Sequence, residues 1–330
     1  MRIESVVTSV SWIPSEAVAG MTKAPFAMGV AHYDDPPPDV IDDLGALQAA
    51  DRFRFANELR AWIDVVDGEI VDAGYSGGGR IGSTTLRVGP GELTLRATPF
   101  PDLRAEPEIR PGSARFVQTA GGRTGAPAPR RVRGAPLVKI QAPTAWTTLS
   151  LILHTDGRVE HALEGASPFP RHWIYDDAGK LVEKTGLIDF KSWYRQAFGR
   201  HSPWGKEDSP ALVTAVETAL ERDLSLRIMR AGAKPRIKRY TEGRELVRQG
   251  QRGRDLFLVL DGVVTIEIDG EPLGEVGPGA VIGERAALEH GVRTATARAR
   301  TPCKVAVASP DDLDAAALTE LSAGHRAEDA

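Results

Sequence analysis

The sequence has a single cysteine, Cys303, so it can form no disulfide framework within the chain and no metal cluster with several cysteine ligands. It also lacks an excess of positive charge, because 41 lysines and arginines are set against 45 aspartates and glutamates. Proteins that bind nucleic acid non-specifically carry a basic surface, and none is predicted here. The apolar neighbours of Cys303 indicate that its side chain packs inside a strand.

Long hydrophobic runs are absent as well. The first twenty residues show no cationic segment followed by an apolar core, and no later run approaches the roughly 20 residues that cross a bilayer. We therefore expect a cytoplasmic protein with no membrane partner. Its 330 residues are enough for two domains, each with its own core.

The most informative stretch is residues 281–299, which run V-I-G-E-R-A-A-L-E-H-G-V-R-T-A-T-A-R-A. Two apolar residues, a turn at Gly283, a short helical segment at 284–288 and a return to alternation predict a strand, one helical turn and a second strand. The first N–H groups of such a turn have no partner within it and can bond to an anion. Ala286 and Ala287 are small enough to let a ligand approach that backbone.

Polar side chains in this stretch suit a ribose phosphate. Glu284 only accepts hydrogen bonds, which favours a pair of hydroxyls, while the planar guanidinium of Arg293 can hold a phosphate through two bonds. Thr294, beside Arg293, can donate or accept and is compatible with adenine and guanine. Arg285 is charged, and we expect its side chain to point outward.

These residues resemble the phosphate-binding cassette of cyclic nucleotide-binding domains, the regulatory β-rolls of cyclic-nucleotide-dependent kinases, channels and bacterial catabolite-activator-like proteins. The resemblance covers about residues 236–313, because the upstream E-L-V-R-Q-G-Q-R-G-R-D-L-F-L-V-L-D-G-V-V-T-I, with Gly250 and Gly262, is similar to the family's first strands. It implies that Glu284 accepts from the ribose 2′-hydroxyl and that Arg293 pairs with the cyclic phosphate. The backbone at Ala286 would then donate to a phosphate oxygen.

The predicted ligand site therefore takes in one contiguous cassette. Its members are Gly283, Glu284, Ala286, Ala287, Arg293 and Thr294. The regulatory ligand is expected to be cAMP rather than cGMP, with no separate cofactor and no metal. Many β-rolls of this kind bind no nucleotide and serve as structural or protein-interaction modules, so that alternative stays open.

The first 200 residues indicate a β-rich barrel or sandwich. Residues 52–65 fit both a helical face and strict alternation, but the turn pair Asp67-Gly68 favours a strand that enters a hairpin. A short helix is expected after Asp39, through Leu47. Further strands are predicted at 83–88, 93–97, 115–119, 137–141 and 146–154, a hairpin at 172–179, and a helix carrying aromatic residues at 190–198.

Three patterns in this half have features of binding sites. Gly77-Gly78-Gly79-Arg80-Ile81-Gly82 matches a dinucleotide fingerprint, but β-branched residues follow it where a helix is needed, so no such site is expected. The arginine-rich residues 119–133 indicate a solvated loop. A hairpin at Asp156-Gly157 would place His154 and His161 on one face, with no third metal ligand fixed nearby.

The expected organisation is a β-rich domain at 1–200, a linker at 201–209, a cyclic nucleotide-binding β-roll with a leading helix at 210–323, and a tail at 324–330. The helix from Ala211 to about Met229 carries an apolar stripe and would join the domains. The sequence thus predicts a signalling protein whose β-roll modulates its N-terminal domain. An N-terminal enzyme regulated by the sensor is a further alternative, although no convincing catalytic constellation is present.

Overall fold

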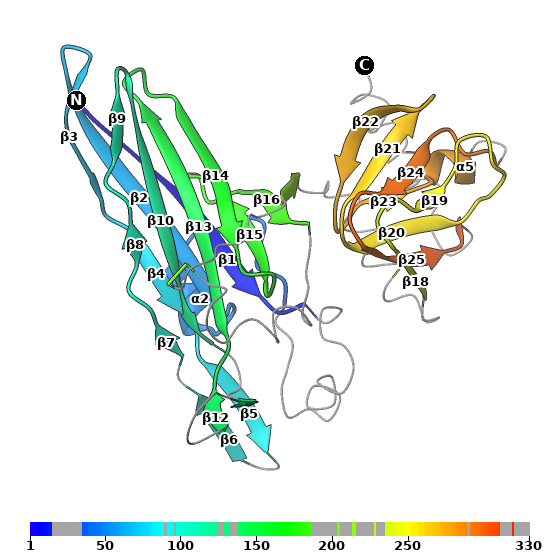
Figure 1. Ribbon diagram of the computed structural model, residues 1–330, viewed down its shortest axis with the longest axis horizontal. Helices are drawn as coiled ribbons and strands as arrows, with labels where there is room; N and C mark the ends of the chain where they lie inside the picture. The colour runs from blue at the N-terminus through cyan, green and yellow to red at the C-terminus, as the bar shows by residue number, and fades with distance from the viewer. Residues whose placement is uncertain are drawn as a thin grey trace. The chain divides into compact units, whose positions relative to one another are not determined.

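The computed structural model describes residues 1–14, 35–88, 91–95, 97–124, 128–131, 138–186, 203–204, 213–215, 228, 235–288, 291–310 and 319. The chain divides into two compact units, Met1–Ala211 and Leu212–Ala330 (Figure 1). No helix in the described part is long and apolar enough to cross a membrane. Each unit is described by itself below.

The first unit contains two large antiparallel sheets. One has the order β16-β15-β1-β2-β3, with β4 also pairing with β2. Its strands are β1 (Arg2–Trp12), β2 (Phe55–Val66), β3 (Glu69–Tyr75), β4 (Gly78–Ile81), β15 (Arg171–Tyr175) and β16 (Leu181–Thr185).

The other sheet has the order β14-β13-β10-β7, with β8 and β9 also pairing with β10. Its strands are β7 (Thr98–Pro99), β8 (Leu103–Arg104), β9 (Glu108–Arg110), β10 (Ser113–Arg123), β13 (Thr144–His154) and β14 (Val159–Ala166). Two separate strand pairs complete the unit: β5 (Thr84–Val88) with β6 (Gly91–Leu95), and β11 (Ala128–Arg131) with β12 (Val138–Gln141).

The two large sheets face each other, so the first unit is a sandwich rather than a barrel. Asn57 on β2 donates to the carbonyl oxygens of Gln118 on β10 and Thr147 on β13, at 3.3 and 3.1 Å. The side chains of β2 alternate between buried and partly exposed along most of its length, so one face of its sheet is buried and the other is partly exposed. Asp67 and Gly68, both with positive φ, form the predicted turn into β3, so the strand interpretation of this segment is confirmed.

Two local predictions in this unit are wrong. The short helix α2 spans Leu44–Ala49, and its N-cap is Asp43 rather than Asp39, with the Asp43 carboxylate accepting from two backbone amides. The second concerns the hairpin at Asp156-Gly157, which was expected to pair Ile152 with His161. Instead, Leu151 pairs with His161 and Leu153 with Val159, a shift of one residue. Residues 155–157 form a three-residue loop instead of a two-residue turn, which places His154 and His161 on opposite faces of their sheet.

The arginine-rich residues 119–133, predicted to form a solvated loop, belong in part to strands β10 and β11. Strand β10 continues to Arg123, and Gly121 and Gly122 allow the backbones of β13 and β7 to approach where a Cβ atom would collide. Within the expected linking helix, Val213–Ala215 forms the short strand β17 and Ile228 is helical. The rest of that helix, and the predicted helix at 190–198, lie outside the described residues.

The second unit contains the predicted β-roll, made of two four-stranded antiparallel sheets. The order of one is β18-β25-β20-β23 and that of the other β19-β24-β21-β22. The strands are β18 (Arg236–Tyr240), β19 (Glu245–Val247), β20 (Leu256–Asp261), β21 (Val264–Ile268), β22 (Glu271–Val276), β23 (Val281–Ile282), β24 (Thr296–Ala299) and β25 (Cys303–Ala308), with the helix α5 (Glu284–Leu288) after β23.

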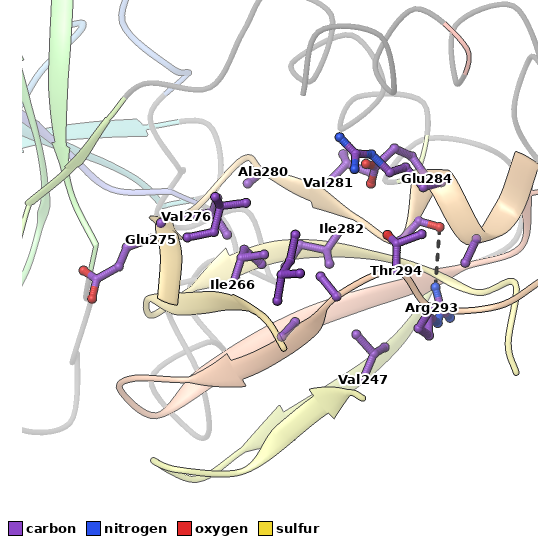
Figure 2. A pocket seen from close by; sticks show the side chains of 18 residues that line it. Val247, Ile266, Glu275, Val276, Ala280, Val281, Ile282, Glu284, Arg293 and Thr294 are labelled. Atoms are coloured by element: carbon purple, nitrogen blue, oxygen red, sulfur yellow. Dashed lines mark hydrogen bonds between the residues drawn. The ribbon is translucent and has the colours of Figure 1, made fainter. Parts of the chain in front are cut away.

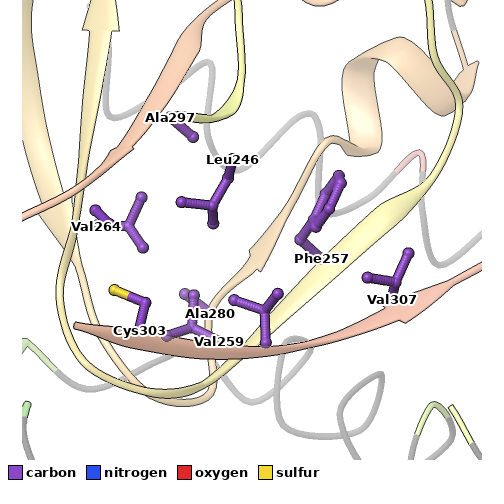
Figure 3. Close-up of a cluster of buried hydrophobic side chains, with 10 residues drawn as sticks. Leu246, Phe257, Val259, Val264, Ala280, Ala297, Cys303 and Val307 are labelled. Carbon is purple, nitrogen blue, oxygen red and sulfur yellow. The ribbon is translucent and has the colours of Figure 1, made fainter. Parts of the chain in front are cut away.

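Strand β20 has the sequence L-F-L-V-L-D and is buried on both faces. Phe257 and Val259 belong to a cluster with Val264, Ala297 and Cys303, drawn in Figure 3. Leu256 and Leu258, on the opposite face, pack with Val281, Ala287 and Ile228. A continuous apolar run is the pattern expected of such a strand, and the packing role predicted for Cys303 is confirmed.

Candidate functional site

A pocket of about 270 Å³ lies in the second unit beside the segment that links β23, α5 and β24. Gly283, Glu284, Ala286, Arg293 and Thr294 all line it, so the structure brings five of the six predicted site residues together (Figure 2). Ala287 does not line the pocket. Its side chain points into the apolar cluster that includes Leu256 and Leu258, where it packs α5 against the sheet.

Arg293 is held firmly although it is a buried cation, with 6% of its surface exposed. Its guanidinium donates to the carbonyl oxygen of Asp255 at 2.8 Å and to that of Gly283 at 3.4 Å, and it lies 5.5 Å from the ring centre of Phe257. Burial lowers the pKa of this guanidinium, and the carboxylates of Asp255 and Glu284 act in the opposite direction. An arginine remains charged under such conditions, so the pocket contains a fixed positive charge.

Two glycines make room for that guanidinium. A Cβ atom on Gly283 would lie 2.4 Å from Arg293 Nη1, and one on Gly253 would lie 3.2 Å from Arg293 Nη2. Gly283 also has a φ of +100°, a conformation that side chains other than glycine rarely adopt. The turn before α5 therefore needs glycine for its backbone and for the space that Arg293 occupies.

Glu284 follows this turn and is equally buried, at 6% exposure. The first intrahelical bond of α5 runs from the Ala287 N–H to the Gly283 carbonyl at 3.1 Å. The amides of residues 284–286 consequently precede the first bond of that kind, and Ala286 has no bulk that would cover them. The pocket thus combines a buried carboxylate, a buried guanidinium and the first turn of α5 around one small volume.

The remaining wall of the pocket is mostly aliphatic and also includes Glu275. Its aliphatic part is formed by Val247, Ile266, Ile268, Leu273, Val276, Ala280, Val281, Ile282 and Ala297. Strand alternation predicts that many of these face inward, but no signal in the sequence separates a side chain that lines a pocket from one that fills the core. Thr294 is exposed and lies beside Glu284 and Arg293 (Figure 2). Arg285 lines the pocket and is partly buried, although its charge predicted a side chain that points outward.

Comparisons with known proteins agree with this geometry. Residues 237–320 match the family model of the cyclic nucleotide-binding domain. A cAMP-dependent protein kinase regulatory subunit from Eremothecium gossypii is 35% identical over 66 residues, which are 20% of this chain and 14% of that protein. The chain therefore spans only about a seventh of the length of this curated relative.

Two solved structures also match part of the chain. A cyclic nucleotide-binding-like protein from Brucella abortus is 30% identical, with 27% of this chain and 78% of that chain covered and a TM-score of 0.23. The regulatory domain of protein kinase A from Toxoplasma gondii, solved with cAMP, is 20% identical, with 36% and 62% covered and a TM-score of 0.27.

The β-roll, the cassette after β23 and the family match all concern the same part of the chain. Residues 237–320 form a domain of the cyclic nucleotide-binding family. The described residues of the first unit fall outside that match.

Proposed function

We propose that the second unit binds a cyclic mononucleotide, with cAMP as the preferred ligand, and that occupancy regulates the first unit. The observation that supports this most directly is the burial of two opposite charges, Glu284 and Arg293, on the wall of one small pocket. A ligand with an anionic end and a hydroxyl-bearing end matches these two groups, because a guanidinium donates to a phosphate and a carboxylate accepts from a hydroxyl.

In this proposal the ligand lies across the cassette. Arg293 pairs with the cyclic phosphate, the backbone at Ala286 donates to a phosphate oxygen, and Glu284 accepts from the ribose 2′-hydroxyl. The aliphatic wall receives the base. The name of the Eremothecium gossypii relative supports cAMP as the first ligand to test.

The test is calorimetry on the full chain with cAMP, cGMP and linear AMP. Hydrogen bonds to charged groups contribute about 1.5–3 kcal/mol each, so Arg293→Leu or Glu284→Ala should weaken binding by roughly ten- to a hundredfold. Arg293→Lys keeps the charge without the two-pronged geometry and should bind between wild type and Arg293→Leu. Glu284→Gln should likewise lie between wild type and Glu284→Ala.

Thermal melts must show that each variant is folded, and Arg239→Leu, an exposed arginine of β18 outside the pocket, serves as the matched control. Wild-type affinity in the folded Arg293 and Glu284 variants would contradict the site. Tighter binding of cGMP than of cAMP would contradict only the choice of base.

The regulatory half of the proposal has its own readout. All six tryptophans lie between residues 12 and 204, within the first unit, and the second unit has none. Tryptophan emission therefore reports the first unit alone. A ligand-dependent change in emission is expected from the wild type and not from Arg293→Leu, whereas unchanged emission at saturating ligand would remove the regulation and leave the binding.

A second function is favoured by one contact in particular. The Arg293 guanidinium donates to the carbonyl oxygens of Asp255 and Gly283, as a purely structural arginine would. A β-roll used as a protein-interaction module would need nothing more. No heat from the wild type with any of the three nucleotides would favour this alternative.

A further inference from the structure

The first unit has a pocket of its own, of about 370 Å³, to which the proposed function gives no role. It lies over strands β1, β2 and β15, beside the segment that leads into α2 and the turn that follows β15. Pockets that hold small molecules have volumes of roughly 300–1,000 Å³. This pocket is therefore large enough for a ligand separate from that of the second unit.

The floor of this pocket is a row of side chains that crosses three strands. Thr8 pairs in register with Glu58 on β2 and with Tyr175 on β15, so the three side chains lie on the same face of the sheet. Ser9, the next residue of β1, points to the other face, where its hydroxyl bonds to that of Thr147. The row is thus directed away from the interior of the sandwich and toward the pocket.

Two groups in this row have bonding capacity to spare. Only 9% of Thr8 is exposed, yet its hydroxyl has no hydrogen-bond partner in the described part of the chain. The side chain of Glu58 is 18% exposed, and within the same part its one ion pair is with Arg60 Nε at 3.9 Å. Arg60 also lies 3.4 Å from Glu4. A hydrogen-bond donor in the pocket can therefore bond to the hydroxyl and to the carboxylate.

The charge of the lining favours a cation as that donor. Four carboxylates line the pocket against one guanidinium, and these charged residues are Asp42, Glu58, Asp176, Asp177 and Arg60. Asp42 and Asp177 are exposed, so they can receive a second positive group at the mouth of the pocket. A ligand with two positive charges matches the lining better than a ligand with one.

Aliphatic side chains decide which kind of cation fits. Val6, Ile41 and Leu44 line the same pocket. A hydrated metal ion gains nothing from such neighbours, because Mg²⁺ and Ca²⁺ prefer oxygen ligands and Mg²⁺ keeps several waters. An alkyl chain gains from contact with them, while an ammonium group at its end bonds to a carboxylate.

We propose that the first unit binds a small aliphatic diamine in this pocket. One ammonium group donates to the Glu58 carboxylate and to the Thr8 hydroxyl. The alkyl chain contacts the aliphatic part of the lining, and the second ammonium group faces Asp42 and Asp177. All of these residues belong to the first unit, so the inference does not depend on cyclic nucleotide binding.

The experiment measures the affinity of the full chain for four probes by calorimetry: diaminobutane, butylamine, butanediol and lysine blocked at its amino and carboxyl ends. Diaminobutane should bind most tightly, butylamine and blocked lysine more weakly because each has one ammonium group, and butanediol not measurably. Blocked lysine separates a free diamine from the side chain of a protein partner, which carries the same ammonium group.

Variants of the floor test the bonds. Glu58→Gln should weaken diaminobutane binding roughly ten- to a hundredfold, because a carboxylate that accepts from an ammonium group is lost. Thr8→Val removes the hydroxyl at nearly constant shape and should weaken binding roughly three- to tenfold, whereas Thr8→Ser keeps the hydroxyl and should bind as wild type does. Glu69→Gln, at an exposed carboxylate of β3 outside the pocket, is the matched control and should leave affinity unchanged.

Variants of the mouth test the second ammonium group. Asp42→Asn combined with Asp177→Asn should reduce the ratio between the diaminobutane and butylamine affinities roughly three- to tenfold. Both residues are exposed, so this variant is expected to fold even where a change in the floor does not. Thermal melts show which variants are folded.

No heat from diaminobutane with the wild type overturns the proposal, and so does wild-type affinity in a folded Glu58→Gln chain. An unchanged ratio in the double aspartate variant overturns the placement of the second ammonium group. Tighter binding of blocked lysine than of diaminobutane overturns the choice of a free diamine. Each of these results leaves the proposed nucleotide site of the second unit as it was.

Discussion

The two units bury polar groups in different ways. In the first unit, one group of buried polar side chains bonds to one another and to backbone between the sheets, as Gln118 does with Asn57. In the second, the buried charges Glu284 and Arg293 stand on the wall of a pocket. A buried polar group whose bonds are all made inside the protein stabilises the fold, whereas a buried charge that borders an open volume can also serve a ligand.

The network around Gln118 illustrates the first case. Its amide donates to Asn57 Oδ1 at 2.8 Å and to the Glu58 carbonyl at 3.0 Å, and its Oε1 accepts from Arg104 Nε at 2.8 Å. Ser9 and Thr147 add a hydroxyl pair at 2.7 Å between the sheets. These bonds tie strands of both sheets into one arrangement, which fixes their mutual register.

The largest expected effect comes from breaking this network. Gln118→Ala leaves Asn57 Oδ1 and Arg104 Nε without their partner and creates a cavity, which should destabilise the first unit by about 3–5 kcal/mol. Urea unfolding followed by tryptophan emission measures this, because every tryptophan lies in the first unit.

Because Gln118 lies in the first unit, we expect the nucleotide affinity of the second unit to be unchanged in Gln118→Ala. The exposed Arg110→Ala, whose ion pair with Glu108 lies at the surface, should alter stability by less than about 1 kcal/mol. A Gln118→Ala chain as stable as wild type would show that the buried network contributes nothing to the sandwich.

His172 gives the next effect, and it depends on pH. The side chain is fully buried, and burial lowers its pKa from 6.5 to about 4. Its Nε2 lies 2.8 Å from the Ser167 carbonyl and must donate, so Nδ1 accepts from the Ser11 hydroxyl at 2.6 Å. The native protein therefore holds the neutral ring.

Because the unfolded chain binds a proton at a higher pH than the native chain, stability is unaffected above about pH 6.5 and falls as the pH drops toward 4. The loss attributable to this ring approaches about 3 kcal/mol. Urea unfolding from pH 7.5 to 4 should show a steeper decline for wild type than for His172→Gln, since other groups cancel in the difference. Parallel curves for the two proteins would contradict the neutral, buried state.

The sequence predicts features within one short segment better than contacts between segments that are far apart in the chain. The cassette is contiguous, so strand, turn, helix and strand could be expected from residues 281–299 alone. The supports of Arg293 could not, because the Asp255 carbonyl is 38 positions away and reaches it only through the sheet order. Arg285 lines the pocket and is partly buried, which its charge does not predict.

In the first unit, strand patterns and the Asp67-Gly68 turn were sufficient for β2 and β3. The pairing of His154 and His161 was wrong because a loop one residue longer than expected shifts every side chain by one position and so to the other face. No pattern in the sequence predicts that the side chains of Asn57 and Gln118 form a hydrogen bond between the two sheets. Such contacts follow from how two sheets face each other, which single-strand periodicity does not encode.

The smallest expected effect concerns Gly283, which is needed both for its positive φ and for the space that Arg293 occupies. Gly283 and Gly270 both have positive φ, +100° and +88°, so alanine at either should cost stability of about 1–2 kcal/mol through backbone strain. A Cβ atom at Gly270 would meet nothing within 4 Å, whereas at Gly283 it would lie 2.4 Å from Arg293 Nη1 and 3.0 Å from the Asp255 carbonyl oxygen.

Gly283→Ala should therefore displace the guanidinium and weaken cyclic nucleotide binding by roughly three- to tenfold, while Gly270→Ala leaves affinity at the wild-type value. The displacement is limited because the end of an arginine side chain can shift, which is why this effect is smaller than that of removing Arg293. Calorimetry with matched thermal melts measures both quantities. Equal affinities in the two alanine variants would mean that the position of the Arg293 guanidinium does not matter to the ligand, and the contrast between an internally satisfied network and a ligand-facing charge would then fail for the second unit.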